Sequence, residues 1–184
     1  EGRPLVRITV LTYVEGKERS TEYDPVVMQV VRALRRQGHQ VAILGVHADV
    51  KRVLAGLQRR RPDLVFNLVE MFAENMFGDI AMEGLLDLLG LKYTGCGPGE
   101  SYLTQDKALS KKLLAFHGIL YPRFAVFARD ADFDTGGNLR MPLFVKPLRT
   151  DASIGTRRNS LVTDMKSLMR RVAIVSAGPL ANLL

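Results

Sequence analysis

The sequence predicts an α/β protein in two parts, a parallel-sheet domain followed by an α+β domain. In the first half, short apolar runs alternate with amphipathic stretches, as they do in βαβ units. Three glycines and a proline over residues 95–99 then interrupt this pattern. Beyond them, short strand-like segments lie beside a helical pattern, which favours antiparallel pairing. The predicted domains therefore cover residues 1–97 and 98–184 of the 184-residue chain.

The first half contains three predicted strands and three predicted helices in alternation. The strands are apolar runs bounded by turn residues, at 5–11, 40–44 and 64–68. Asp24 followed by Pro25 predicts the start of a helix, and Gly38 predicts its end. Apolar residues at helical spacing predict two further helices, at 50–57 and 80–89. Because helices separate the strands, the strands are expected to pair in parallel.

The second half is predicted to begin with a helix over 104–117. Apolar runs at 124–127 and 141–146 predict two strands, and the polar segment between them suggests that they pair antiparallel. A further short strand is predicted at 159–162. Thr163 is the expected cap of a last helix that reaches Arg171.

Composition excludes several classes of protein. The chain has 26 Lys plus Arg against 19 Asp plus Glu, so its formal net charge of +7 permits phosphate-bearing partners. No aromatic residues interleave with the basic clusters, so nucleic acid is not an expected partner. No run approaches the roughly 20 apolar residues of a membrane span. The single cysteine, Cys96, excludes an intramolecular disulfide and a Cys-cluster metal site. A cytoplasmic protein without a membrane partner is the expectation.

Lys146 and the residues after it are the strongest local candidates for chemistry. Lys146 ends an apolar run and precedes Pro147, which favours extended backbone at the lysine. In the loop that follows, Arg149 adds charge, and small residues such as Ser153 and Gly155 let backbone N–H groups approach an anion. A lysine that extends into solvent and a solvated turn are the alternatives. Together, the lysine and the loop favour a phosphate site.

Five segments follow one another over about residues 62–156. They are Pro62-Asp63-Leu64-Val65-Phe66-Asn67, Gly90-Leu91-Lys92-Tyr93-Thr94-Gly95, Asp106-Lys107 with Ser110-Lys111, Phe144-Val145-Lys146-Pro147, and Ser153-Ile154-Gly155. In order and approximate spacing they resemble the D-alanine–D-alanine ligase branch of the ATP-grasp superfamily. The resemblance implies a pre-ATP-grasp α/β domain at 1–97 and the N-terminal part of an α+β ATP-grasp domain at 98–184.

The resemblance also implies an activity and a nucleotide site. Members of this family use ATP to convert a carboxylate to an acyl phosphate, which an amine attacks to form an amide or peptide bond. Lysines that match Lys107 and Lys146 contact the nucleotide's phosphates in that family. A loop that matches Arg149, Ser153 and Gly155 closes over them. For Lys107, helical periodicity taken alone favours an exposed helix face instead.

The resemblance also suggests Glu18 as the family glutamate that receives the amino group of the first substrate. Glu15 and Glu22 are rivals for this role, and an ordinary solvated loop glutamate is the alternative. The resemblance further implies Mg²⁺, whose carboxylate and asparagine ligands lie in the family's C-terminal third. The last carboxylate side chain here is Asp164, so we expect these ligands in residues beyond the present chain and none within it. The tail at 172–180 resembles a strand and turn deeper in the ATP-grasp fold. No catalytic residue is identified.

The substrates are less sharply indicated than the nucleotide. D-Alanine is the leading candidate substrate, which would place the protein in peptidoglycan biosynthesis. A homodimer is a possible oligomeric state. Asp151-Ala152-Ser153 stands where the family commonly shows Gly-Ser-Ser, and residues 70–78 replace a glycine-rich acidic segment. Two alternatives therefore stay open. One is an ATP-grasp ligase for other amino acids or peptides, and the other is a non-catalytic module that binds a nucleotide or a protein.

Overall fold

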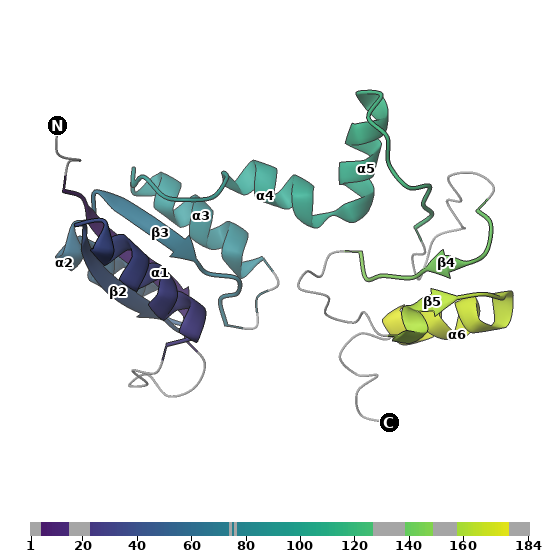
Figure 1. Cartoon of the computed structure of the whole chain (residues 1–184), viewed down its shortest axis with the longest axis horizontal. Coiled ribbons are helices and arrows are strands. Elements are labelled where there is room, and N and C mark those ends of the chain that lie inside the picture. Colours follow the sequence, from purple (N-terminus) through teal and green to yellow (C-terminus); the bar gives the residue numbers. More distant parts are fainter. Residues whose placement is uncertain are drawn as a thin grey trace. The chain divides into compact units, whose positions relative to one another are not determined.

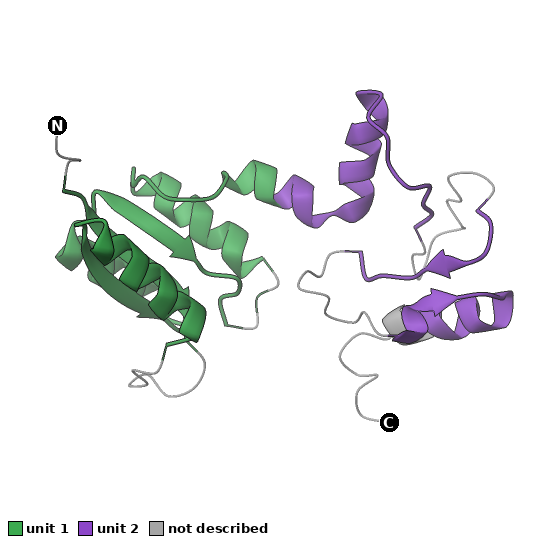
Figure 2. Cartoon of the chain, in the orientation of Figure 1, with its two compact units in different colours: residues 1–101 green, residues 102–184 purple. Residues whose placement is uncertain are grey.

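The computed structural model describes residues 5–14, 23–73, 75, 77–126, 139–148 and 158–176, with side chains of the last range described as far as Val172. The chain divides into two compact units, Glu1–Ser101 and Tyr102–Leu184 (Figure 2). Both units mix helices and strands, and the first contains a parallel sheet. The predicted α/β class is confirmed.

Unit 1 is built on a three-stranded parallel sheet in the order β2-β1-β3 (Figure 1). Strands and helices alternate as predicted, as β1 (Arg7–Tyr13), α1 (Pro25–Arg36), β2 (Gln40–Val46), α2 (Val50–Arg60), β3 (Leu64–Leu68) and α3 (Gly78–Leu88). The predicted bounds of β3 are confirmed. β1 begins and ends two residues later than predicted, because Thr12 and Tyr13 still pair with Gly45 and Val46. Sheet pairing therefore extends the strand past its apolar run.

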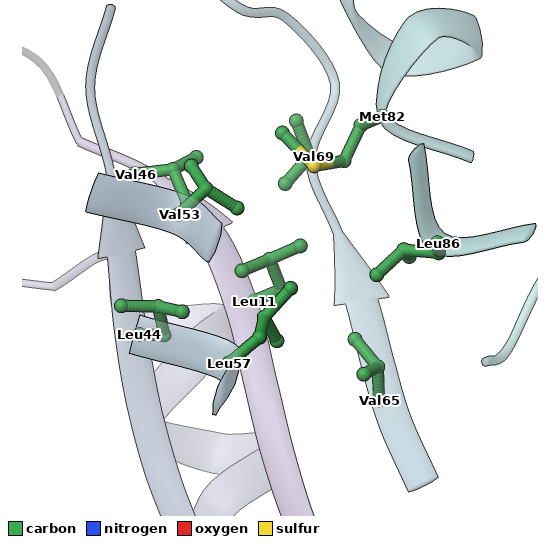
Figure 3. Close-up of a cluster of buried hydrophobic side chains, with 9 residues drawn as sticks. All are labelled: Leu11, Leu44, Val46, Val53, Leu57, Val65, Val69, Met82 and Leu86. Atoms are coloured by element: carbon green, nitrogen blue, oxygen red, sulfur yellow. The ribbon is translucent and has the colours of Figure 1, made fainter. Parts of the chain in front are cut away.

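Side chains on the two faces of the sheet form two separate apolar clusters. On β1, Val10 packs with Val27 and Val31 of α1, whereas its neighbour Leu11 belongs to the opposite cluster. That larger cluster joins the sheet to α2 and α3 (Figure 3), and its members are Leu11, Leu44, Val46, Val53, Leu57, Val65, Val69, Met82 and Leu86. The sheet thus has a helix on one face and two helices on the other.

The ends of α1 form as the sequence predicts. The Asp24 side chain accepts a hydrogen bond from the Val26 N–H at 2.7 Å, and Pro25 is the first helical residue. Beyond the last residue of α1, Gly38 has φ of +86°, a conformation that glycine adopts without a steric penalty. Local chemistry therefore sets both ends of this helix.

Arg7 and Asp63 join the beginning of β1 to the residue that precedes β3. The Arg7 guanidinium donates to Asp63 Oδ1 at 2.6 Å, and the Arg7 N–H donates to Oδ2 at 2.8 Å. The Asp63 N–H in turn donates to the Arg7 carbonyl at 2.9 Å. The Arg7 hydrogen bonds lower the pKa of Asp63 to about 2. This reciprocal contact helps to set the register of the two strands.

The helix predicted over 104–117 is confirmed as α5 (Lys107–Phe116), but its predicted start is wrong, because residues 104 and 105 end a separate helix, α4 (Pro98–Gln105). They are separated at Asp106, whose Oδ1 accepts from the N–H groups of Ala108 and Leu109 and so starts a new helix. The glycine-rich segment at 95–99 is partly helical, because α4 begins within it. Pro98 is the first residue of α4, a position that proline favours.

Further along unit 2, two short strands pair antiparallel, β4 (Leu143–Phe144) and β5 (Leu161–Val162). The predicted partner of β4 was instead the segment 124–127. That strand is not found at Phe124 or Ala125, and Phe127 lies outside the described residues. β4 is also shorter than the predicted 141–146. Of the strand predicted at 159–162, the second half is confirmed as β5, and a 3₁₀ turn at Arg158–Ser160 occupies the first half.

The last helix, α6 (Met165–Ser176), is longer than predicted. Its cap is Asp164 rather than Thr163, since Asp164 Oδ1 accepts from the Ser167 N–H at 2.8 Å. Residues 172–176 are helical, so the strand predicted at the start of the 172–180 tail is wrong. The rest of that tail lies outside the described residues.

Candidate phosphate-binding site

The described part of unit 2 contains a cavity of about 840 Å³, which is within the usual range for small-molecule sites. Its apolar wall includes Leu143 from β4 and Leu168 and Val172 from α6. Five cationic residues also line it, namely Lys107, Lys111, Arg123, Arg140 and Lys146. Neither aspartate nor glutamate occurs among the described residues that line this cavity. The lining therefore suits an anion with several charges.

The sequence-predicted candidates Lys107 and Lys146 both line this cavity, although they lie far apart in the sequence. Lys107 is the first residue of α5, and its N–H donates to the carbonyl of Leu148 at 3.4 Å. This bond joins the start of α5 to the segment that carries Lys146. The fold thus brings together two lysines whose local sequence patterns are separately ambiguous.

Asp106 fixes the start of α5. Its Oδ1 accepts from the Ala108 N–H at 3.0 Å and from the Leu109 N–H at 2.9 Å. The Ser110 hydroxyl donates to the Leu103 carbonyl at 2.6 Å and so joins α5 to the preceding helix. Since Lys107 follows Asp106 directly, this cap also determines where the lysines of α5 begin.

Asp106→Ala is therefore expected to destabilise unit 2 by about 0.5–2 kcal/mol, the usual loss on removing a helix N-cap. Asp106→Asn is the matched control, because an asparagine side chain caps a helix about as well. Thermal unfolding of the two variants and the parent, followed by circular dichroism, measures the difference. Equal loss in both variants would show that the cap is not the source of the stability.

Lys146 lies two residues beyond β4, and neighbouring hydrogen bonds hold its backbone. The N–H of Val145 donates to the carbonyl of Ser160 at 2.8 Å, which extends the contact between β4 and β5. The Lys146 ammonium lies 5.2 Å from the centroid of the Phe144 ring. Its side chain is exposed, so the ammonium is accessible to a ligand in the cavity.

Lys111 is a third cavity lysine, which the sequence reasoning did not select as a site residue. It lies one helical turn after Lys107 on α5, and its ammonium is 5.0 Å from the centroid of the Phe124 ring. Burial lowers the pKa of Lys111, and the charges of Lys146 and Lys107 lower it further. The spacing of four residues from Lys107 was the signal that could have identified it.

Four predicted site residues lie outside the described residues, namely Glu18, Arg149, Ser153 and Gly155. The described cavity lining does not fit Mg²⁺, because this hard cation takes oxygen ligands and the lining presents ammonium and guanidinium groups. Within the described ranges, no group of three or more His, Cys, Asp or Glu residues is arranged to hold a metal ion. Nor does any described helix have the length and apolar composition needed to cross a membrane.

Unit 1 contains a cavity of different character, with a volume of about 700 Å³. Its lining is mostly apolar and includes Phe72, Met82, Leu85 and Leu88. The charged residue in this lining is Asp87, which would repel a phosphate. The cation-rich cavity of unit 2 is therefore the better candidate for a polyphosphate.

The chain is similar to several curated proteins named D-alanine–D-alanine ligase. No protein-family model matches the sequence. The D-alanine–D-alanine ligase of Cupriavidus metallidurans is 38% identical over 105 residues, covering 56% of this chain and 32% of the relative. The D-alanine–D-alanine ligases of Novosphingobium aromaticivorans and Rhodospirillum rubrum are 32% and 33% identical, with 82% and 81% of this chain covered. These two matches cover 45% and 48% of the relatives, so the chain spans at most about half of their length.

Proposed function

We propose that the whole protein joins a carboxylate to an amine and hydrolyses ATP to ADP and phosphate in doing so. The premise is that the chain is a D-alanine–D-alanine ligase-like protein of the ATP-grasp superfamily. The proposed product is an amide or peptide bond, and the proposed intermediate is an acyl phosphate. Mg²⁺ is the expected metal, as the family resemblance implies. The unit 2 cavity is the proposed site of the ATP phosphates.

One observation carries this proposal. Lys107 and Lys146, the two residues that the family resemblance identifies as phosphate contacts, line the same cavity. Ordinary surface lysines at a helix start and near a strand end have no reason to converge. The described lining of this cavity also contains several cationic side chains and no carboxylate, a composition that favours binding of an anion.

In such a reaction the cavity residues would bind the phosphates and neutralise their charge. A carboxylate oxygen attacks the γ-phosphorus and ADP leaves, after which an amine attacks the acyl carbon and phosphate leaves. Catalysis of phosphoryl transfer depends mainly on positioning and on neutralising the phosphate charge. Lys107 and Lys146 supply positive charge, while the apolar wall reduces screening by water. Both effects stabilise negative charge on the transferring group.

D-Alanine is the proposed substrate because the relatives are named for its ligation. The product would be D-alanyl-D-alanine, a building block for peptidoglycan biosynthesis. The proposed compartment is the cytoplasm, where ATP is present. Other amino acids or peptides are the second candidate substrates, since residues 70–78 depart from the glycine-rich acidic segment of the family.

Phosphate release tests the proposal on the full-length protein. With ATP and Mg²⁺ present, D-alanine is expected to stimulate release strongly, and L-alanine is the matched control because it differs only in configuration. Chromatography should show that D-alanyl-D-alanine forms together with phosphate. Stimulation by another amino acid alone would support the second substrate class. Binding of ATP without stimulation by any amino acid would contradict the ligase and favour a binding module.

A further inference from the structure

We propose that Lys111 is a third phosphate-binding residue of the unit 2 cavity, beside Lys107 and Lys146. This inference rests on the proposed function, since it assumes that the cavity receives a nucleotide polyphosphate. It goes further by assigning a ligand contact to a residue that the local sequence presents as an ordinary helix-surface lysine.

The position of Lys111 on α5 supports the assignment. Lys107 and Lys111 are four residues apart, so they lie on the same face of the helix, and both line the cavity. Lys112 is the next residue along the helix, and it is exposed and does not line the cavity. The helix thus directs one member of the Lys111-Lys112 pair to the cavity and the other to solvent.

An aromatic ring holds the Lys111 ammonium at the cavity. The ammonium lies 5.0 Å from the centroid of the Phe124 ring, which is within cation–π range. Phe124 also lines the cavity, so the ring and the ammonium belong to the same wall. A lysine held in this way loses less conformational freedom when it contacts a ligand.

The electrostatic surroundings of Lys111 indicate a site that needs an anion. Burial lowers the pKa of Lys111, followed by the like charges of Lys146 and Lys107. The charged side chains that face the cavity from every described segment are cationic, and they are Lys107, Lys111, Arg123, Arg140 and Lys146. Gathering like charges costs free energy, which a bound polyphosphate would offset. Binding should therefore favour the protonated form of Lys111 and take up a proton at alkaline pH.

A purely structural role is the competing explanation. In that case the four-carbon stem of Lys111 would cover apolar surface while its ammonium simply reached water. Lys111→Met separates the two explanations, because methionine keeps an unbranched apolar stem and removes the charge. Lys111→Arg keeps the charge and serves as the conservative variant.

The test is a calorimetric titration of the full-length protein with ATP, and separately with inorganic tripolyphosphate as a probe that lacks the nucleoside. Lys111→Met is expected to lower the affinity for both ligands by roughly ten- to a hundredfold, the usual range for one charge-assisted contact. Lys112→Met is the matched control and should bind like the parent. Lys111→Arg should recover most of the affinity. In two buffers of different ionisation enthalpy at alkaline pH, proton uptake on binding should be larger in the parent than in Lys111→Met.

Unchanged affinity for both ligands in Lys111→Met, with proton uptake equal to that of the parent, would overturn the inference. If the parent binds ATP and ligates D-alanine in that case, the proposed function survives without a Lys111 contact. If the parent binds tripolyphosphate through Lys111 but no amino acid stimulates phosphate release, the Lys111 site survives and the ligase proposal fails. A parent that binds neither ligand would contradict both.

Discussion

Lys146→Ala is expected to lower the affinity for ATP by roughly ten- to a hundredfold. The lysine lines a cavity whose described lining has no carboxylate, so its charge is available to the phosphates. The variant should fold, because the Lys146 side chain is exposed and the backbone beside it is held by the bond from Val145 to Ser160. Calorimetric titration with ATP measures the change. The loss should shrink at high salt, since screening weakens contacts between charges.

Lys166→Ala is the control for this prediction. Lys166 is an exposed lysine of α6 that does not line the cavity, so its removal changes the net charge equally without removing a proposed contact. ATP affinity in this variant should match the parent. Lys107→Ala should resemble Lys146→Ala in effect. Equal affinities for Lys146→Ala and Lys166→Ala would remove Lys146 from the phosphate site.

Leu86→Ala is expected to destabilise unit 1 by about 2–5 kcal/mol, the usual range for a buried leucine replaced by alanine. Leu86 on α3 is 0% exposed and lies in the large cluster with Leu11 of β1 and Val65 of β3 (Figure 3). Truncation leaves a cavity in the apolar cluster that joins α3 to the sheet. Urea unfolding followed by circular dichroism measures the free energy.

The same helix offers a matched control, because Leu88 is also a leucine of α3 but is 88% exposed. Leu88→Ala should change the free energy of unfolding by less than about 0.5 kcal/mol, as surface substitutions usually do. The two variants remove the same atoms and differ in burial. Similar losses in both would contradict the placement of α3 against the sheet.

Local chemistry made much of unit 1 predictable. The Asp24 side chain caps α1 and the Pro25 ring suits its first position. The run at 64–68 coincides with β3, in which four of the five residues are apolar. Alternating strands and helices predicted the parallel sheet, which is confirmed. The helix start and the strand bounds depend on residues that are neighbours in the sequence, so they can be predicted from the sequence alone.

Unit 2 was less predictable because long-range contacts decide its structure. The residues on either side of Asp106 suit a helix. α4 and α5 are separate because the Asp106 side chain accepts hydrogen bonds from the N–H groups of Ala108 and Leu109 and so starts a new helix. β4 pairs with β5 through two residue pairs, a partnership that apolar patterning cannot specify. The polar segment between 127 and 141 instead favoured the preceding segment, 124–127, as the partner.

The site shows the same division between local and long-range information. Lys107 and Lys146 each had an ordinary surface explanation. The local sequence indicated Lys146 as a candidate, whereas Lys107 was selected by the family resemblance alone. Their presence in one cavity follows from the fold, as does the contribution of Phe124. Lys111 was within reach of sequence reasoning, because a spacing of four residues from Lys107 implies a shared helix face.

Lysine labelling with and without ATP tests the central proposal, that the unit 2 cavity holds the nucleotide's phosphates. The full-length protein is treated with an amine-reactive acetylating reagent, and modification of each lysine is measured by peptide mass spectrometry. At saturating ATP, modification of Lys107, Lys111 and Lys146 should fall several-fold, while Lys112 and Lys166 keep their modification rates. Unchanged modification of all three cavity lysines at an ATP concentration that saturates binding would contradict the proposal.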